Sequence, residues 1–462
     1  MDEKTLHELL DRAVASEPSL GPVVDNAVRA GIRVRRRRMV LGAAGCVVAA
    51  AVIGGMIPVL NHVLAVQPPP VVARTMTPSP AGSGFGYGTT PSPGPGHGAK
   101  HGRPGSPGRS PKTKHSLAIP PGPPGVYVVG AGSSGAYLAR VDGARGQVSK
   151  VDPIGGYAAA IAVTPDHRTA YVLKEDSVQP VLIGTNSAGP RITVGNMPVA
   201  MAMTPDGRTL YVVNQGSNTV TPIATATNKA GHAVPVGQYP SAIAITPDGT
   251  TAYVVNGHSN SVTPIRIADD KAGPAIPVGE FPLAITITPD GRTAYVANEL
   301  SETVTPISTA SNKAGDPIGV LGHPLAITVS PSGTTAYVFN GPSVMPINVA
   351  TNAAAPELIS LGRGGVGYGW IAVTPDGQTV YAPTINGIAP ISTASNKVGK
   401  IVGVGAGASA IAFGTAGRTA YVCSGWGNGP GPGMVTPVDV QTNQSGKPIG
   451  LNGPCDAMVV IP

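Results

Sequence analysis

The sequence SAIAITPDGTTAYVVNGHSNSVTPIRIADDKAGPAIPVG, at residues 241–279, contains four short runs in which β-branched or small residues alternate with polar ones. Turn-forming residues separate these runs, and this pattern is typical of short β-strands. The TPDG segment at residues 246–249 suits a type I turn, because proline fits the second position, aspartate the third and glycine the exit. The stretch therefore predicts four consecutive strands joined by tight turns.

The same block recurs along the chain after residue 156, with a tyrosine at its centre. The spacings between these tyrosines are 40, 42, 42, 42, 44 and 40 residues. A repeat of about 42 residues with four strands matches the length and strand number of a β-propeller blade. We therefore expect an all-β propeller of four-stranded blades. The central tyrosines are Tyr171, Tyr211, Tyr253, Tyr295, Tyr337, Tyr381 and Tyr421.

Short motifs inside the repeats are similar to those of a known family. They are YVVN at 211–214 and 253–256, YVAN at 295–298, VTPI beginning at 220, 262 and 304, and NKAG beginning at 228 and 312. Over about 340 residues the chain resembles the YVTN family of propeller repeats. The resemblance implies a propeller of surface-layer or extracytoplasmic type, and it implies no reaction.

The two ends of the repeat region predict how the ring closes. Tyr127 lies 44 residues before Tyr171, in register with the other copies, but only the linker precedes it where a first strand should be. The final residues, GPCDAMVVIP at 453–462, match a first strand with nothing after it. We therefore expect the C-terminal strand to complete the N-terminal blade, which gives eight blades and no open edge. Seven blades remain the alternative if one irregular copy only decorates the ring.

A glycine motif near the start of this region invites a different interpretation. GVYVVGAGSSGA at residues 125–136 has the Gly130-x-Gly132-x-x-Gly135 spacing that binds dinucleotides. A helix starting there would last about six residues before Asp142, and another blade follows instead of a second βαβ half. The glycines are therefore predicted to form a strand-to-strand turn, with no dinucleotide or other cofactor.

A charge-free run near the N-terminus predicts a membrane anchor. Five arginines lie within residues 33–38, and residues 39–60 contain no charged side chain over 22 positions. That length crosses the hydrocarbon core of a bilayer as a helix, and the arginines place its N-terminal side in the cytoplasm. We expect a single-pass cell-membrane protein with a cytoplasmic tail (1–38), a transmembrane helix (39–60) and the propeller (126–462) outside. A signal peptide cleaved after Ala65 is the alternative.

The segments on either side of the anchor have separate expectations. The tail contains short amphipathic stretches that either set the topology or bind a partner. Residues 61–125 are rich in proline and glycine, which predicts a disordered linker. This linker carries six Lys and Arg and no Asp or Glu, which suits passage through an anionic cell-wall polymer; a merely soluble linker is the other interpretation.

The charge of the propeller region argues against nucleic-acid binding. The whole chain has a formal charge of +7, but residues 126–462 contain 17 Lys and Arg against 18 Asp and Glu. A nucleic-acid surface should cluster its basic residues on the folded domain. We therefore expect no nucleic-acid partner.

Few residues suggest a reaction. The recurring turn acids lie once per blade around a ring, so turn geometry explains them better than catalysis. The histidines lack metal-ligand spacing, and we expect no metal and no catalytic residues. The favoured function is a binding or scaffold module at the cell surface or cell wall, with a wall polymer, surface protein or glycan as ligand. The alternative is a propeller hydrolase or lactonase-like enzyme with a metal in its tunnel.

Two candidate features remain. Tyr368, Trp370 and Trp426 lie in longer glycine-rich loops of neighbouring repeats, on one rim of the predicted propeller, so they form a candidate ligand-binding surface. Alternatively, the tryptophans fill the core beneath these loops. Cys423 and Cys455 fall at the same end of adjacent blades, so we expect a disulfide there if their Cα atoms come within about 7 Å.

Overall fold

The structure is a computed structural model. It describes residues 125–461 apart from 133–134, 143–144, 156–157, 186, 363–369, 415–416 and 426–432. The expected tail (1–38), transmembrane helix (39–60) and linker (61–125) lie outside these described residues, except that Gly125, at the end of the expected linker, already belongs to the first strand. Within the described part, no helix is both long and apolar enough to span a bilayer.

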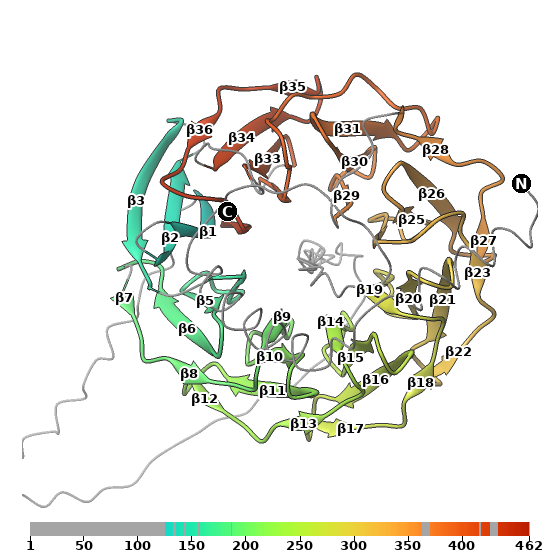
Figure 1. Ribbon diagram of the computed structural model, residues 1–462, viewed down its shortest axis with the longest axis horizontal. Coiled ribbons are helices and arrows are strands. Elements are labelled where there is room, and N and C mark those ends of the chain that lie inside the picture. The colour runs from blue at the N-terminus through green and yellow to red at the C-terminus, as the bar shows by residue number, and fades with distance from the viewer. Residues whose placement is uncertain are drawn as a thin grey trace, which may run out of the picture. The chain divides into compact units, whose positions relative to one another are not determined.

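The described elements are all strands, and they form eight antiparallel sheets arranged around a ring as the blades of a propeller (Figure 1). The bounds of the strands follow, blade by blade. Blade 1 contains β37 (Ala457–Ile461), β1 (Gly125–Gly132), β2 (Gly135–Asp142) and β3 (Gln147–Pro153). Blade 2 contains β4 (Ala160–Val163), β5 (Thr169–Leu173), β6 (Ser177–Leu182), β7 (Ser187–Ala188) and β8 (Ile192–Thr193). Blade 3 contains β9 (Pro198–Met203), β10 (Thr209–Asn214), β11 (Thr219–Ala224), β12 (Lys229–Ala230) and β13 (Val234–Pro235). Blade 4 contains β14 (Pro240–Ile245), β15 (Thr251–Asn256), β16 (Ser261–Arg266), β17 (Lys271–Ala272) and β18 (Ile276–Pro277).

The second half of the ring follows the same plan. Blade 5 contains β19 (Pro282–Ile287), β20 (Thr293–Asn298), β21 (Thr303–Ser308), β22 (Lys313–Ala314) and β23 (Ile318–Gly319). Blade 6 contains β24 (Ala326–Val329), β25 (Thr335–Phe339), β26 (Ser343–Asn348), β27 (Ala353–Ala354) and β28 (Ile359–Ser360). Blade 7 contains β29 (Ala372–Val373), β30 (Thr379–Thr384) and β31 (Gly387–Ser392). Blade 8 contains β32 (Ala410–Phe413), β33 (Thr419–Ser424), β34 (Met434–Asp439), β35 (Gln444–Ser445) and β36 (Ile449–Gly450).

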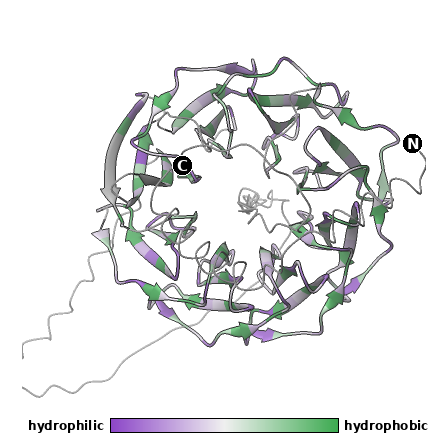
Figure 2. Ribbon diagram, in the orientation of Figure 1, coloured by the Kyte–Doolittle hydropathy of each residue, from purple (hydrophilic) through white to green (hydrophobic). Residues whose placement is uncertain are grey.

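The outermost strand of most blades is split into two short pieces. In blade 4, β17 pairs with one end of β16 and β18 pairs with the other end. Blade 7 has only isolated bridges at this position, which join Val398 and Val402 to β31. Figure 2 shows hydrophilic residues on several of these outermost pieces, as expected for an edge that faces water.

The ring closes as the repeat count predicts. Strand β37 pairs antiparallel with β1, with Tyr127 opposite Val459, so the last strand of the chain is the innermost strand of the first blade. The eight-bladed interpretation is therefore confirmed, and the seven-bladed alternative is wrong. Every strand pair of the ring lies within residues 125–461.

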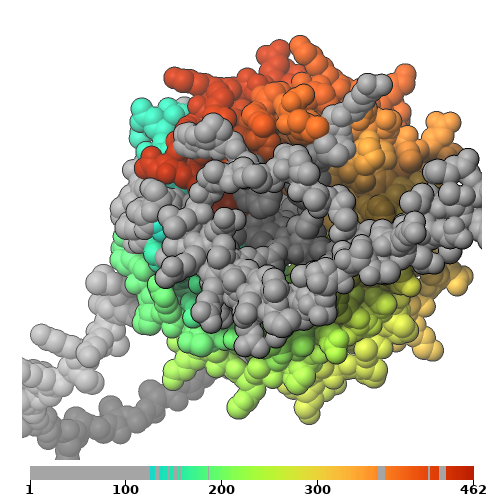
Figure 3. All heavy atoms as spheres, in the orientation of Figure 1, coloured from blue at the N-terminus to red at the C-terminus, as the bar shows by residue number. Residues whose placement is uncertain are grey.

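The core consists of layers between neighbouring blades. One layer packs Tyr211 and Val213 of blade 3 against Ile243, Ala252 and Ile265 of blade 4, and all five are buried. Because strands of one blade alternate their side chains between two faces, each blade contributes to two such layers. Figure 3 shows the side chains of consecutive blades in contact around the ring.

The recurring tyrosines link blades, as expected of packing residues. The hydroxyl of Tyr253 in blade 4 donates a hydrogen bond of 2.6 Å to Oδ1 of Asn312, in the β21–β22 turn of blade 5. Tyr171, Tyr295 and Tyr381 donate in the same way to asparagines of the next blade. Tyr211 instead donates to the carboxylate of Asp270. Burial is the larger cause that raises the pKa of Tyr211, and the neighbouring carboxylate of Asp270 raises it further.

The turn acids have the structural role expected of them. In the turn between β14 and β15, Thr246 Oγ1 donates to Asp248 Oδ1 at 2.6 Å, and the same oxygen accepts from the backbone N–H of Thr250 at 3.0 Å. Gly249 completes the turn at φ 70°, where glycine is favoured. The aspartates therefore organise the turns and lie on separate blades.

The glycine motif at the start of the ring forms a hairpin. Gly132 lies opposite Gly135 in the β1–β2 register, as the strand-to-strand interpretation predicts. A Cβ on Gly130 would come within 1.8 Å of the carbonyl oxygen of Pro454. Gly130 is therefore needed because the backbone that leads into β37 passes directly against it.

Candidate binding rim

The strand order gives the propeller two different rims. We use "loop rim" for the connections between the second and third strands of each blade together with those that lead from one blade to the next. In blades 3–6 it comprises residues 194–197, 215–218, 236–239, 257–260, 278–281, 299–302, 320–325 and 340–342. We use "turn rim" for the opposite connections, which contain the TPDG and NKAG segments.

Three bulky apolar residues of the loop rim adopt left-handed backbone conformations. Met197, Tyr239 and Phe281 have φ values of 50°, 56° and 49°, and they occupy the same position in three consecutive repeats. This conformation costs a residue with a Cβ about 1–2 kcal/mol. The corresponding blade-to-blade connections elsewhere place glycines in this conformation, with Gly322 at 88° and Gly405 at 91°.

Hydrogen bonds from two directions hold Tyr239 and Phe281. The backbone N–H of Phe281 donates to Oδ1 of Asn260 in the preceding blade at 3.0 Å, and its carbonyl accepts from the N–H of Glu299 at 3.1 Å. Tyr239 makes the equivalent bonds with Asn218 and Gly257, both at 2.9 Å. These hydrogen bonds join loops of neighbouring blades and make the rim a rigid platform.

The platform presents an aromatic cluster that spans blades 4 and 5. The ring of Tyr239 stacks on that of His258, with centroids 4.3 Å apart and planes inclined by 16°. Phe281 lies 6.0 Å from Tyr239 and 5.8 Å from His258, tilted to both. Tyr239 and Phe281 are only partly buried and His258 is exposed, so the cluster faces solvent.

Apolar side chains extend this surface to the neighbouring blades. Met197, Leu300 and Leu321 are 59%, 57% and 64% exposed, and these are the three most exposed of the large hydrophobic side chains among the described residues. His323 Nδ1 lies 3.1 Å from the carbonyl oxygen of Glu299, which ties blade 6 to the Leu300 loop of blade 5. The exposed apolar surface thus runs across blades 3–6.

Carboxylates accompany the apolar residues on the loop rim. Glu280 and Glu302 are exposed, and Glu299 is partly buried. Burial raises the pKa of Glu299, while the nearby His323 partly opposes this shift. The loop-rim residues of blades 3–6 include no lysine or arginine.

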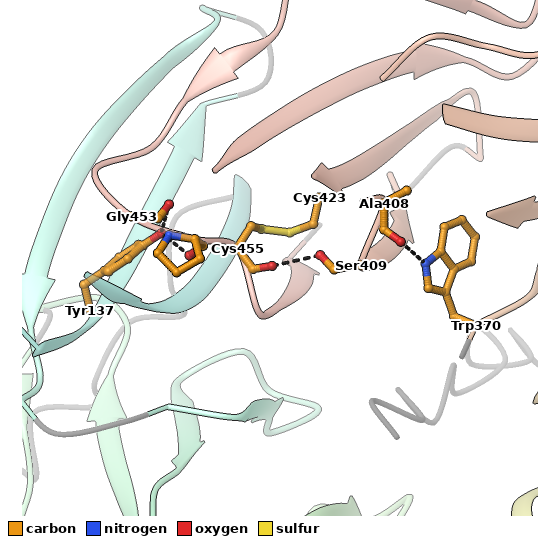
Figure 4. Close-up of a disulfide and its surroundings, with 8 residues drawn as sticks. Tyr137, Trp370, Ala408, Ser409, Cys423, Gly453 and Cys455 are labelled. Atoms are coloured by element: carbon orange, nitrogen blue, oxygen red, sulfur yellow. Dashed lines mark hydrogen bonds between the residues drawn. A yellow bond between two sulfur atoms is a disulfide. The ribbon is translucent and has the colours of Figure 1, made fainter. Parts of the chain in front are cut away.

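The structure does not support Trp370 as a surface residue. Trp370 is 7% exposed, packs with Ile388, Ile411 and other residues of blades 7 and 8, and donates from Nε1 to the carbonyl of Ala408 at 2.9 Å (Figure 4). It is a core residue, as the alternative interpretation held. Tyr368 and Trp426 lie outside the described residues.

A disulfide joins Cys423 of β33 to Cys455, two residues before β37, with Cα atoms 5.6 Å apart (Figure 4). The bridge therefore connects blade 8 to blade 1 where the ring closes. Tyr137 donates to the carbonyl of Pro454 at 2.7 Å, and Ser409 donates to that of Cys455 at 2.8 Å.

The sequence-based candidate surface rests on irregular, glycine-rich loops, so it does not include the aromatic cluster. A signal for it was present in four successive repeats: the residue before the proline at the start of the repeat is Met197, Tyr239, Phe281 or His323. Binding residues concentrate on loops that a rigid scaffold holds, so large apolar and aromatic residues at this repeated loop position indicate a surface function.

A metal centre receives no support from the described part of the chain. It contains no group of three or more His, Cys, Asp or Glu side chains that could hold a metal ion. The recurring turn acids point into their own turns and are separated by whole blades.

The family model that matches part of the chain is also a propeller, although one of seven blades. Residues 224–316, about a fifth of the chain spanning blade 4 and most of blade 5, match the family model "Lactonase, 7-bladed beta-propeller". No curated protein matches the sequence. Among solved structures, dihydro-heme d1 dehydrogenase NirN in complex with DHE has a TM-score of 0.62 at 17% identity, over 74% of this chain and 78% of NirN.

Two further structures are similar. A functionally unknown protein from Desulfotomaculum acetoxidans DSM 771 has a TM-score of 0.51 at 15% identity, over 73% of this chain and 99% of that protein. Kuenenia stuttgartiensis hydrazine synthase has a TM-score of 0.48 at 21% identity, over 61% of this chain and 95% of the other. At these identities the likeness concerns the fold, so the chain is a β-propeller protein whose function has to be argued from its own surface.

Proposed function

We propose that this chain is a membrane-anchored, extracytoplasmic β-propeller that acts as a binding or scaffold module at the cell surface or cell wall. Its ligand would be a wall polymer, surface protein or glycan. The observation that carries the binding role is the solvent-facing cluster of Tyr239, His258 and Phe281. Bulky residues in costly left-handed conformations, without the benefit of full burial, indicate a functional constraint. The anchor and the location rest on residues 33–60 and on the YVTN resemblance.

Capture from an isolated cell-envelope fraction tests the binding role. Full-length protein should retain an envelope component, and Tyr239→Ser combined with Phe281→Ser should reduce this retention about tenfold or more, as for central contact residues. Ile401→Ser is the control, because Ile401 is an exposed hydrophobic residue (37%) that lies off the loop rim. Equal capture by all three proteins would refute a ligand-binding loop rim.

Protease added to intact cells tests the topology. If the propeller lies outside, cleavage within residues 61–124 should release a soluble fragment that contains the eight blades. Protection of the propeller combined with cleavage of residues 1–38 would show the opposite orientation.

A propeller hydrolase or lactonase-like enzyme is the second candidate, because the lactonase model matches residues 224–316. Purified full-length protein would then contain about one equivalent of tightly bound metal and hydrolyse a lactone. Metal removal should abolish that hydrolysis while leaving capture on the loop rim unchanged, so the two activities can be separated.

A further inference from the structure

The two rims of blades 3–6 differ in charge. The described loop-rim connections contain Glu280, Glu299 and Glu302 but no lysine or arginine. The turn rim of the same four blades carries five aspartates and six basic side chains, and Arg208, Arg266, Lys271 and Arg292 form ion pairs with aspartates there. These basic residues are Arg208, Lys229, Arg266, Lys271, Arg292 and Lys313. The turn rim is therefore nearly balanced in charge, whereas the loop rim of the same blades is an anionic, apolar face.

The acids and the aromatic cluster belong to one small unit. Glu280 directly precedes Phe281, and the backbone carbonyl of Glu280 accepts a hydrogen bond from the N–H of Leu300 at 3.2 Å. The carbonyl of Phe281 accepts from the N–H of Glu299 at 3.1 Å. Two carboxylates, an aromatic ring and an exposed leucine are thus fixed together on a doubly hydrogen-bonded pair of loops.

This combination favours a particular ligand chemistry. The faces of aromatic rings attract cations, and adjacent carboxylates strengthen this attraction. The apolar flanks formed by Met197, Leu300 and Leu321 offer no hydrogen bonds, so they suit apolar side chains better than sugar hydroxyls. An anionic polymer would be repelled by the three glutamates.

We infer that the loop rim of blades 3–6 docks a cationic polypeptide segment with interspersed apolar residues. Its lysine or arginine side chains lie over Tyr239, His258 and Phe281, and its apolar residues contact Leu300 and Leu321. This inference rests on the proposed binding function and names the class of partner. Charge complementarity selects the partner, and the rigid platform lowers the entropic cost of binding.

Fluorescence anisotropy with full-length protein tests the inference through three labelled probes: the peptide (Lys-Leu)5, the peptide (Glu-Leu)5, and a neutral chitin oligosaccharide. Each probe is measured with the wild type and with Tyr239→Asn combined with Phe281→Asn. Asparagine tolerates the left-handed conformation, so these variants keep the fold while removing the rings. For each probe, the difference in binding between the wild type and this double variant measures binding to the loop rim.

We expect (Lys-Leu)5 to bind, to weaken about tenfold in the ring variant, and to weaken as salt is raised. Glu280→Gln combined with Glu302→Gln should weaken binding severalfold and flatten its salt dependence. The matched control is Asp316→Asn combined with Glu357→Gln, which removes two exposed carboxylates from the outer circumference of blades 5 and 6 and should leave binding unchanged.

Three results would overturn the inference. Ring-dependent binding of the chitin oligosaccharide or of (Glu-Leu)5 in place of (Lys-Leu)5 would assign the rim to another ligand class, while the proposed binding function stands. An equal loss of binding in the Asp316 and Glu357 control would show only general charge attraction. If every probe binds equally to the wild type and the ring variant, and the ring variants also capture the envelope component as well as the wild type does, the binding function is refuted as well.

Discussion

A substitution at Met197 measures the free-energy cost of the left-handed backbone by itself, because Met197 is not part of the aromatic cluster. It is left-handed (φ 50°) and 59% exposed, and its side chain has no ring. Met197→Asn should therefore raise the free energy of unfolding by about 0.5–1 kcal/mol, because asparagine tolerates this conformation. Chemical denaturation measures the change. Leu300→Asn is the control, since Leu300 is similarly exposed (57%) but does not have a positive φ, and it should bring no gain.

The tyrosine contacts between blades can be measured by double-mutant cycles. Tyr253→Phe and Asn312→Ala should show a coupling of about 1 kcal/mol, the usual net value of a hydrogen bond. Tyr211→Phe and Asp270→Ala should show a larger coupling, about 1.5–3 kcal/mol, because that acceptor is a carboxylate. Equal couplings would show that solvent at the turn screens the charge of Asp270.

The turn between the first two strands sets the geometry with which a blade reverses, and the turn glycines differ in their surroundings, as a comparison of the TPDG turn at 204–207 with the equivalent SPSG turn at 330–333 shows. Gly207 and Gly333 have nearly equal φ values, 70° and 72°. A Cβ on Gly207 would meet Cδ of Pro165 at 2.5 Å, whereas on Gly333 the nearest atom is 3.5 Å away. Both alanine variants should lose about 1–2 kcal/mol from the backbone, and Gly207→Ala should lose more because of the clash. Equal losses would mean that the blade 2 turn shifts to make room.

The same turns predict a dependence on pH. The hydroxyl of Thr204 and the N–H of Arg208 lower the pKa of Asp206, and Thr288 and Arg292 do the same for Asp290. A carboxyl whose pKa is lower in the folded protein adds stability above its unfolded pKa, near 4, and this stability is lost as the pH falls through the folded value. Asp206→Asn combined with Asp290→Asn should therefore lower the Tm at pH 7 and have no such effect near pH 2. A deficit that persists at pH 2 would show that asparagine disrupts the turn itself.

The repeat pattern was sufficient to predict the ring, because the same strand spacing recurs and each copy needs a neighbour to bury its faces. It also predicted closure by residues 453–462 and the role of the turn acids. It could not place Trp370, whose burial depends on Ala408, 38 residues away in the approach to the next blade. Nor did it reveal the aromatic cluster, because stacking of Tyr239 on His258 depends on a left-handed turn that the residue types alone do not favour.

Closure is the point at which the whole ring depends on chain ends that are far apart in sequence. The last strand β37 is held to blade 1 by pairing with β1, by Tyr137 and by a buried layer that includes Val128, Cys455 and Met458. The disulfide adds a covalent link between residues 32 positions apart, across the boundary of blades 8 and 1. In the chain-entropy model, a link of this length stabilises by about 3–4 kcal/mol.

Cys423→Ala combined with Cys455→Ala should therefore lower the free energy of unfolding by about 2–4 kcal/mol. The loss should be local at first, because the other blades remain fully paired. Hydrogen exchange should accelerate in β37 and β1, while β15 of blade 4 keeps its protection. Cys46→Ala is the control, since this third cysteine takes no part in the closure bridge. If exchange accelerates equally in β15, the ring opens as one cooperative unit. If it does not accelerate in β37, the hydrogen bonds of Tyr137 and the buried layer hold the closure without the bridge.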